Sequence, residues 1–109
     1  MPTDITTTVA EGIASSKPTR VREVLRGVKN SGGSIVAVSE DEIVSALGAL
    51  ARQGIYVEPT SAAAAAGLRQ LLKSGAITPQ QTTVLILTGS GLKASEKIGQ
   101  LLNLRARSE

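Results

Sequence analysis

Two short polar segments have residue types that could contact an anion or a cofactor. The first is Thr88-Gly89-Ser90-Gly91, which follows an apolar run. Glycines at the carboxyl end of a strand in an α/β sheet allow backbone amides to approach a phosphate group. The segment lacks the glycine-lysine-serine ending of a P-loop, and a glycine pair between a strand and a helix is also typical of a tight turn. Anion binding and a plain turn therefore both stay open.

The second segment, Glu58-Pro59-Thr60-Ser61, stands directly before an alanine-rich run. The hydroxyl of Thr60 or Ser61 suits a helix cap, and the Glu58 carboxylate suits the positive end of a helix dipole or a ligand. A solvated charge is the ordinary explanation for Glu58, because carboxylates are mostly exposed. Residue types alone leave a cap and a binding site as alternatives.

The composition excludes several classes of chemistry. The 109 residues include no cysteine and no histidine, which removes disulfides, thiolate nucleophiles and the commonest zinc ligands and general base. The net charge is +3, but the basic residues are spread out and Tyr56 is the only aromatic residue, so nucleic-acid binding is not favoured. No apolar run is long enough for a membrane span or a secretory signal. We expect no metal site and a soluble cytoplasmic protein.

Three helices are predicted before the Thr88-Gly89-Ser90-Gly91 segment, and a fourth is predicted after it. Helical spacing of apolar residues predicts the first helix, from near Pro18 to Gly32. Ser39 and Glu42 have the form of a capping box for the second helix, and Gly54 follows it as a left-handed cap. The alanine-rich run favours a third helix, from Ser61 to Gly75.

Two apolar runs indicate strands between these helices. Ile35–Val38 and Thr83–Leu87 are short and apolar at successive positions, which is typical of strands covered on both faces. Ile55–Val57 can form only a brief extended segment. Because helices separate and follow the strands, the predicted fold class is α/β, with a small parallel sheet and helices packed on it.

A sheet with two central strands is thin. We therefore expect missing sequence, or another copy of the chain in a homodimer, to complete it. No linker or internal repeat divides residues 1–109, which are predicted to form a single domain with a loose arm over residues 1–8 and a frayed end over residues 105–109.

Four motifs follow one another in the order and spacing of a known family. They are Ala10–Ala14, Val38–Ile43, Gly54–Ala63 and Leu87–Lys93. Together they resemble the carboxy-terminal part of threonine synthases, over approximately residues 8–103. The most specific pieces are Glu-Pro-Thr-Ser-Ala-Ala, which begins at Glu58, and Thr-Gly-Ser-Gly-Leu-Lys, which begins at Thr88.

The resemblance implies the fold shared with the tryptophan synthase β subunit and pyridoxal phosphate as cofactor. It also implies a reaction that converts O-phosphohomoserine and water into threonine and phosphate. By position, Thr88 would place its hydroxyl against the pyridine nitrogen of the cofactor, and Gly89 would let the backbone pass close to the ring. Glu58, Pro59 and Ser61 would lie near the same face. A neutral hydroxyl does not force protonation of that nitrogen as a carboxylate would.

The chain departs from the family in two respects. The Schiff-base lysine segment and the glycine-rich loops for the cofactor phosphate belong to the family's amino-terminal portion, and nothing here resembles them, so no residue of this chain is predicted to be catalytic. In addition, Ser90 and Ala94 stand where the family's Thr-Gly-His-Gly-Leu-Lys-Asp pattern commonly has histidine and aspartate. Lyases acting on serine, threonine or cysteate are therefore alternatives.

Three interpretations follow. The first is a fragment or truncated relative of such an enzyme of amino-acid biosynthesis, which supplies one wall of a cofactor site and is inactive without the missing amino-terminal portion. The second is a non-catalytic binding or interaction module that keeps the scaffold. The third is an unrelated small α/β domain in which Thr88-Gly89-Ser90-Gly91 forms a phosphate nest.

Overall fold

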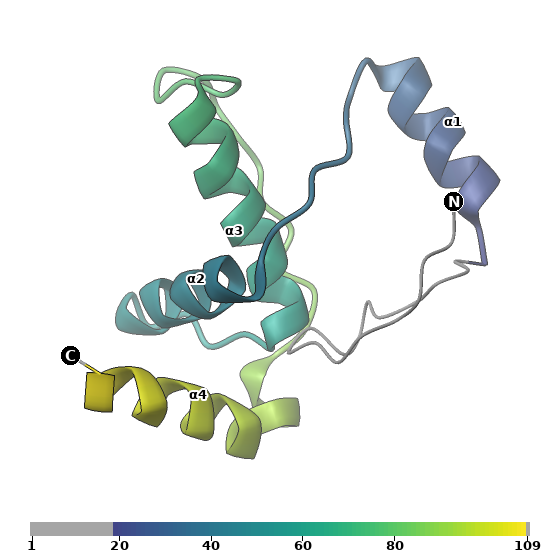
Figure 1. The fold of residues 1–109 in the computed structure, drawn as a ribbon. Coiled ribbons are helices and arrows are strands. Elements are labelled where there is room, and N and C mark those ends of the chain that lie inside the picture. Colours follow the sequence, from purple (N-terminus) through teal and green to yellow (C-terminus); the bar gives the residue numbers. More distant parts are fainter. Residues whose placement is uncertain (1–18, 109) are drawn as a thin grey trace.

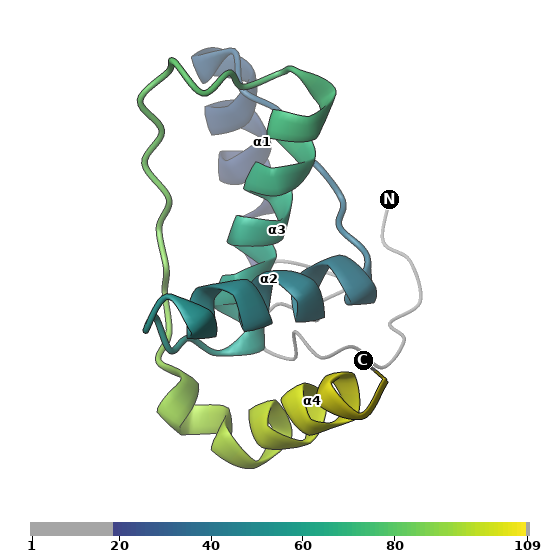
Figure 2. The same ribbon diagram turned by 90° about the vertical axis from the view of Figure 1, so that its left-hand side faces the viewer.

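Four α-helices and a short 3-10 helix form the regular structure of a computed structural model, which describes residues 19–108. The α-helices are α1 (Val21–Ser31), α2 (Glu40–Arg52), α3 (Pro59–Ser74) and α4 (Ser95–Ser108), and η2 (Gly91–Ala94) directly precedes α4. Helix α2 crosses α3, and α4 lies below α2 in both views (Figures 1 and 2). Figure 1 shows α1 standing apart from the other three helices.

Helix α1 has the apolar face that the sequence predicts, but its residues are not buried. Val21, Val24 and Leu25 are 44%, 53% and 54% exposed, and the helix contains no buried residue. It ends as predicted at Gly32, whose φ of 71° lies in the left-handed region that favours glycine. The predicted start, Pro18, lies outside the described residues.

Helix α2 begins with the predicted capping box. The Glu42 N–H donates to Ser39 Oγ over 3.1 Å, and the Ser39 N–H donates to Glu42 Oε1 over 2.9 Å. The hydrogen bond from the Ser39 backbone, followed by the one involving the Ser39 side chain, lowers the pKa of the Glu42 carboxyl. Gly54 lies just beyond the helix with φ 80°, as predicted.

Helix α3 begins two residues before the predicted start. Glu58 is the N-cap residue, without a side-chain cap bond, and Pro59 occupies the first turn, where its missing N–H costs nothing. Neither Thr60 nor Ser61 therefore occupies the cap position, which was one of the two alternatives for their hydroxyls. The helix ends as predicted at Gly75.

The core lies where α2, α3 and the start of α4 meet. Alanines on α3 let the backbone of α2 approach closely, and Leu47 of α2 and Ile98 of α4 are each only 2% exposed between the helices. The buried apolar side chains are all aliphatic. The buried apolar residues are Ile43, Ala46, Leu47, Val57, Ala62, Ala65, Ala66 and Ile98.

The predicted small parallel sheet is wrong. Residues 33–39 and 82–88 are extended, but neither segment pairs with a strand among the described residues. An apolar run indicates that a segment avoids water, whereas a strand also needs a neighbouring backbone about 4.8 Å away for its hydrogen bonds. Side chains such as Val38 and Leu85 avoid water by packing against the helical core instead. The described architecture is therefore helical, with two extended connections.

No helix within residues 19–108 is both long enough and apolar enough to cross a membrane. The predicted loose arm over residues 1–8 and the Ala10–Ala14 motif lie outside the described residues, as does Glu109. The single-domain organisation stays a prediction.

Candidate functional site

The two polar segments predicted from the sequence are joined by one antiparallel β-bridge, between Val57 and Ser90. On one side of this pair, the Glu58 N–H donates to the Gly89 carbonyl over 3.1 Å. On the other side, the N–H of the residue after Ser90 donates over 3.1 Å to the carbonyl of the residue before Val57. Val57 is also part of the buried core. The bridge therefore fixes both segments against a rigid part of the molecule.

Ser61 links the two segments through its side chain. It is only 2% exposed, although it is polar. Its Oγ accepts a hydrogen bond from the Gly89 N–H over 2.8 Å and lies 2.9 Å from Oγ1 of Thr88. Thr88 itself is an exposed residue, although its contact with Ser61 is partly buried. The structure thus brings Ser61, Thr88 and Gly89 into one cluster, which we call the hydroxyl cluster.

Glu58 and Pro59 border the hydroxyl cluster in different ways. The Glu58 side chain lies against Gly89, so that a Cβ atom at position 89 would overlap its carboxyl group. Pro59 is buried in the first turn of α3, where it contributes packing rather than a polar contact. The structure therefore brings the two segments that contain the five predicted site residues together in space. Four of the five take part in hydrogen bonds between the segments: Glu58, Ser61, Thr88 and Gly89.

Tyr56 is a part of this region that the sequence interpretation did not assign to the site. Its ring covers Gly91, where a Cβ atom would lie only 2.6 Å from Cε1 of the ring. Its hydroxyl donates a hydrogen bond to Ser95 Oγ over 3.1 Å. The available signal was its position as the only aromatic residue, two residues before Glu58. Tyr56 holds the glycine loop against the start of α4.

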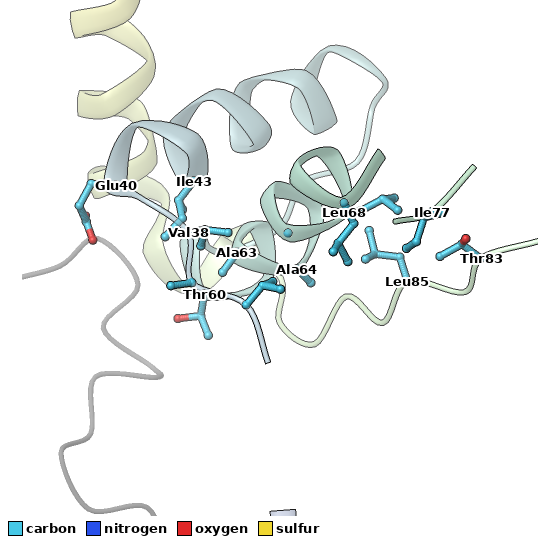
Figure 3. Close-up of a pocket in the computed structure, with 14 residues that line it drawn as sticks. Val38, Glu40, Ile43, Thr60, Ala63, Ala64, Leu68, Ile77, Thr83 and Leu85 are labelled. Carbon is cyan, nitrogen blue, oxygen red and sulfur yellow. The ribbon is translucent and has the colours of Figure 1, made fainter. Parts of the chain in front are cut away.

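An apolar hollow of about 700 Å³ lies between α3 and the two extended segments. Val36 and Val38 line it from the first segment, Leu85 from the second, and Leu68 and Leu71 from α3. Figure 3 shows that the labelled side chains around it are mostly hydrocarbon. This composition suits apolar packing better than recognition of a charged substrate.

The hollow and the hydroxyl cluster are neighbouring but distinct features. None of the five predicted site residues lines the hollow, whereas Thr60, next to Ser61 in the first turn of α3, does. In Figure 3, the oxygen atoms of Glu40 and Thr60 mark the end of the hollow formed by the starts of α2 and α3. Within residues 19–108, no group of acidic side chains is arranged to hold a metal ion.

Comparison with known proteins places most of this sequence in one family. Residues 1–89 match the family described as pyridoxal-phosphate dependent enzyme. The chain is 44% identical over 87 residues to the threonine synthase of Methanocaldococcus jannaschii, 41% identical over 92 residues to that of Methanosarcina acetivorans, and 38% identical over 87 residues to that of Halalkalibacterium halodurans. These matches cover 79%, 84% and 79% of this chain.

The matches cover 22%, 23% and 25% of the three relatives, so the chain spans about a quarter of their length. They confirm the resemblance to threonine synthases. The family match covers residues 1–89 and so includes Glu58, Pro59, Ser61, Thr88 and Gly89. Pyridoxal phosphate is the cofactor of the matched family. With most of its length matched, this chain belongs to the pyridoxal-phosphate dependent enzymes.

Proposed function

We propose that this chain supplies one wall of the cofactor site in a threonine synthase-type enzyme, which converts O-phosphohomoserine and water into threonine and phosphate. The observation that carries the proposal is the hydroxyl cluster, in which Ser61, Thr88 and Gly89 are held together by contacts of 2.8 and 2.9 Å. These residues come from the two segments that most resemble threonine synthases. The similarity to three threonine synthases supports the same assignment.

The hydroxyl cluster fits a flat cofactor that has a ring nitrogen. Thr88 is exposed and carries a neutral hydroxyl. Gly89 has no side chain, and the Glu58 carboxyl group occupies the space that its Cβ atom would fill. When bound, pyridoxal phosphate withdraws electrons from the amino acid that it holds. Because a neutral hydroxyl does not force protonation of the ring nitrogen, Thr88 would bind and orient the ring while limiting that withdrawal.

The remaining parts of the site would come from outside this sequence. The resemblance implies that the Schiff-base lysine and the phosphate-binding loops lie in an amino-terminal portion, and we propose that this portion is the partner of the chain. Two surfaces support a large apolar partner: the hollow of about 700 Å³ and the uncovered face of α1. Val84 and Ile86, beside the hollow, are 85% and 72% exposed. Covering them would stabilise the complex by removing apolar surface from water.

A complementation experiment tests this proposal. The chain would be mixed with a truncated Methanocaldococcus jannaschii threonine synthase that ends before the segment similar to this chain. We expect saturable pyridoxal phosphate absorbance in the mixture, and a single adduct on a lysine of the truncated enzyme after borohydride reduction and mass spectrometry. Phosphate release from O-phosphohomoserine should appear only in the mixture.

The matched control is the same truncated enzyme mixed with its own missing segment. If this control restores cofactor binding and this chain does not, the proposal fails, and the non-catalytic interaction module becomes the better interpretation. A saturable adduct on one lysine of this chain alone would contradict the proposed dependence on an external lysine. Thr88→Val tests the site residue, and we expect it to weaken cofactor binding without preventing association of the two polypeptides.

A further inference from the structure

The direction of the hydrogen bonds in the hydroxyl cluster follows from the burial of Ser61. Its Oγ accepts the Gly89 N–H, so that interaction does not use the hydroxyl hydrogen of Ser61. Ser61 is 2% exposed, and a buried hydroxyl hydrogen needs an acceptor. Among the described residues, the acceptor that the structure offers is Oγ1 of Thr88, at 2.9 Å. Ser61 therefore donates to Thr88.

The reverse direction is disfavoured for a simple reason. If Thr88 donated to Ser61, then Ser61 Oγ would accept two hydrogen bonds while its own hydrogen stayed buried without an acceptor. Thr88 has no such difficulty, because it is exposed and its hydrogen can point outward. The chain of donors thus runs from the Gly89 N–H through Ser61 to Thr88, and each bond polarises the next.

We propose that Ser61 is a positioning residue that fixes the Thr88 hydroxyl as an outward hydrogen-bond donor, and that Ser61 does not itself contact the cofactor. This inference rests on the proposed function, since the acceptor of the Thr88 hydroxyl would be the ring nitrogen of the cofactor. An unprotonated ring nitrogen accepts such a bond. A protonated one would have to donate to the remaining lone pair of Thr88 Oγ1, which would leave the Thr88 hydrogen without that acceptor. Ser61 thereby favours the unprotonated ring through Thr88. The Glu58 carboxyl group, which lies against Gly89, borders the same site and acts in the opposite sense when it is ionised, because a negative charge stabilises a protonated nitrogen. A Ser61 substitution leaves this carboxyl group in place.

The restricted rotation of Thr88 strengthens this role. A β-branched side chain has few accessible χ1 rotamers, so a hydrogen bond from Ser61 to Oγ1 leaves the outward hydrogen a narrow range of directions. Gly89 follows directly in the chain, and its N–H holds Ser61 in place. Loss of the Ser61 hydroxyl would remove the hydrogen bond that holds Thr88 Oγ1 in this orientation.

The first measurement uses the chain without cofactor. In an equal mixture of H2O and D2O, a protected hydroxyl gives two resolved Cβ signals in the carbon-13 NMR spectrum, and a rapidly exchanging one gives an averaged signal. We expect two signals for Ser61 and one for Thr88, with exposed Ser90 as the averaged control. An averaged signal for Ser61 together with two signals for Thr88 would overturn the assigned direction.

The second measurement uses the complemented protein with nitrogen-15-labelled pyridoxal phosphate. The nitrogen shift reports protonation of the ring independently of turnover. We expect the unsubstituted mixture to keep the ring unprotonated over a wider pH range than Ser61→Ala, by about tenfold in proton concentration or more, which corresponds to one pKa unit. Thr88→Val should also narrow the pH range over which the ring is unprotonated. The double variant that carries Thr88→Val and Ser61→Ala should titrate almost as Thr88→Val does.

The outcomes separate this inference from the proposed function. Bound cofactor whose nitrogen titration is unchanged by Ser61→Ala would overturn the positioning role while leaving the proposed function intact. Absence of cofactor from the unsubstituted mixture, with its matched control active, would overturn the proposed function and the role assigned to Ser61 together. Circular dichroism of each variant establishes that the comparison is between folded proteins.

Discussion

Two regions of this molecule have similar aliphatic side chains but very different burial. In the region formed by α2, α3 and the start of α4, Leu47 and Ile98 are 2% exposed. In the region formed by α1 and the extended segments, Leu25 is 54% exposed and Val84 is 85% exposed. The hydroxyl cluster is attached to the first region through α3 and the Val57–Ser90 bridge. The well-packed region therefore anchors the candidate site. In the other region, α1 and some side chains of the extended segments are exposed to solvent.

This difference teaches how an apolar pattern should be interpreted. The spacing of apolar residues on α1 indicates an apolar face, but it does not specify which molecule or segment buries that face. In α2 the cover comes from within the described residues, because α3 presents small alanines to it. For α1 and residues 82–88, the proposed amino-terminal portion would provide it.

The largest expected effect contrasts a core leucine with an exposed one. Leu47→Ala should lower the free energy of unfolding by about 2–5 kcal/mol, because it leaves a cavity between α2 and its neighbours. Leu25→Ala should change it by about 0.5 kcal/mol or less, because Leu25 is half exposed. Urea unfolding followed by circular dichroism measures both. Equal losses in the two variants would show that α1 is packed in solution.

Should Leu47→Ala fail to fold, Ile98→Val provides a milder change in the same core. It removes one methylene group from a side chain that is 2% exposed, and we expect a loss of about 0.5–1.5 kcal/mol. If Ile98→Val lowers the free energy of unfolding by more than Leu25→Ala does, the two regions still differ as proposed.

The next effect compares two glycines. Gly91→Ala places a methyl group within 2.6 Å of the Tyr56 ring, so the ring must move and give up its hydrogen bond to Ser95. We expect a loss of about 1–3 kcal/mol, as for other overpacked sites. Gly27→Ala, in α1, meets no atom within 4 Å and should raise helix content without lowering stability. Thermal unfolding followed by circular dichroism measures both variants.

A double-variant cycle identifies the cause of the Gly91 effect. If overlap with the ring is responsible, Gly91→Ala should cost less when Tyr56→Ala is already present. Additive losses would contradict the packing of Tyr56 on this loop.

A smaller effect concerns the ends of helices in the two regions. Ser39→Ala removes the capping hydroxyl that accepts the Glu42 N–H, and we expect a loss of about 1 kcal/mol from α2. Ser31→Ala removes a side-chain bond to the Val28 carbonyl at the end of exposed α1, and should cost about 0.5 kcal/mol or less. Urea midpoints give the comparison. A larger loss from Ser31→Ala would contradict the independence of α1.

The smallest effect is a dependence of stability on pH. The pKa of Glu42 is lowered in the folded protein, so its stabilising contribution is complete above the ordinary glutamate value of about 4.3 and is lost as pH falls through the lower folded value. Between pH 6 and pH 3, Glu42→Gln should therefore lose less stability than the unsubstituted chain. Glu23→Gln, in α1, serves as the control substitution. Parallel pH profiles for the Glu42 variant and the unsubstituted chain would contradict the capping interaction.

Local structure could be predicted from the sequence wherever neighbouring residues decide it. The capping box of Ser39 and Glu42 and the glycine at the end of each of the first three helices were predicted, because their hydrogen bonds and backbone angles involve residues only a few positions apart. The start of α3 was predicted two residues too late, at Ser61. Pro59 occupies the first turn of the helix, where a proline is well tolerated. The side chain of Ser61 instead bonds to a residue far along the chain.

The candidate site was predicted in part. The comparisons confirm the family that the motifs beginning at Glu58 and Thr88 indicate. The role of the five residues at a cofactor site stays a prediction. The role of Tyr56 was missed, because its contact with Gly91 depends on the path of the chain. The parallel sheet was predicted wrongly, because apolar runs do not specify which backbone lies beside them.

The sequence by itself determined the family, the helix ends and the residue types of the site, since each depends on residue identity at short spacing. Only the tertiary structure decided that Ser61 is buried between Gly89 and Thr88, and that residues 33–39 and 82–88 are extended without pairing within the described part of the chain. The physical reason is that burial and hydrogen-bond direction depend on which atoms meet in space. The sequence pattern gives the hydrogen-bonding and apolar groups of each residue, but not the atoms that they contact.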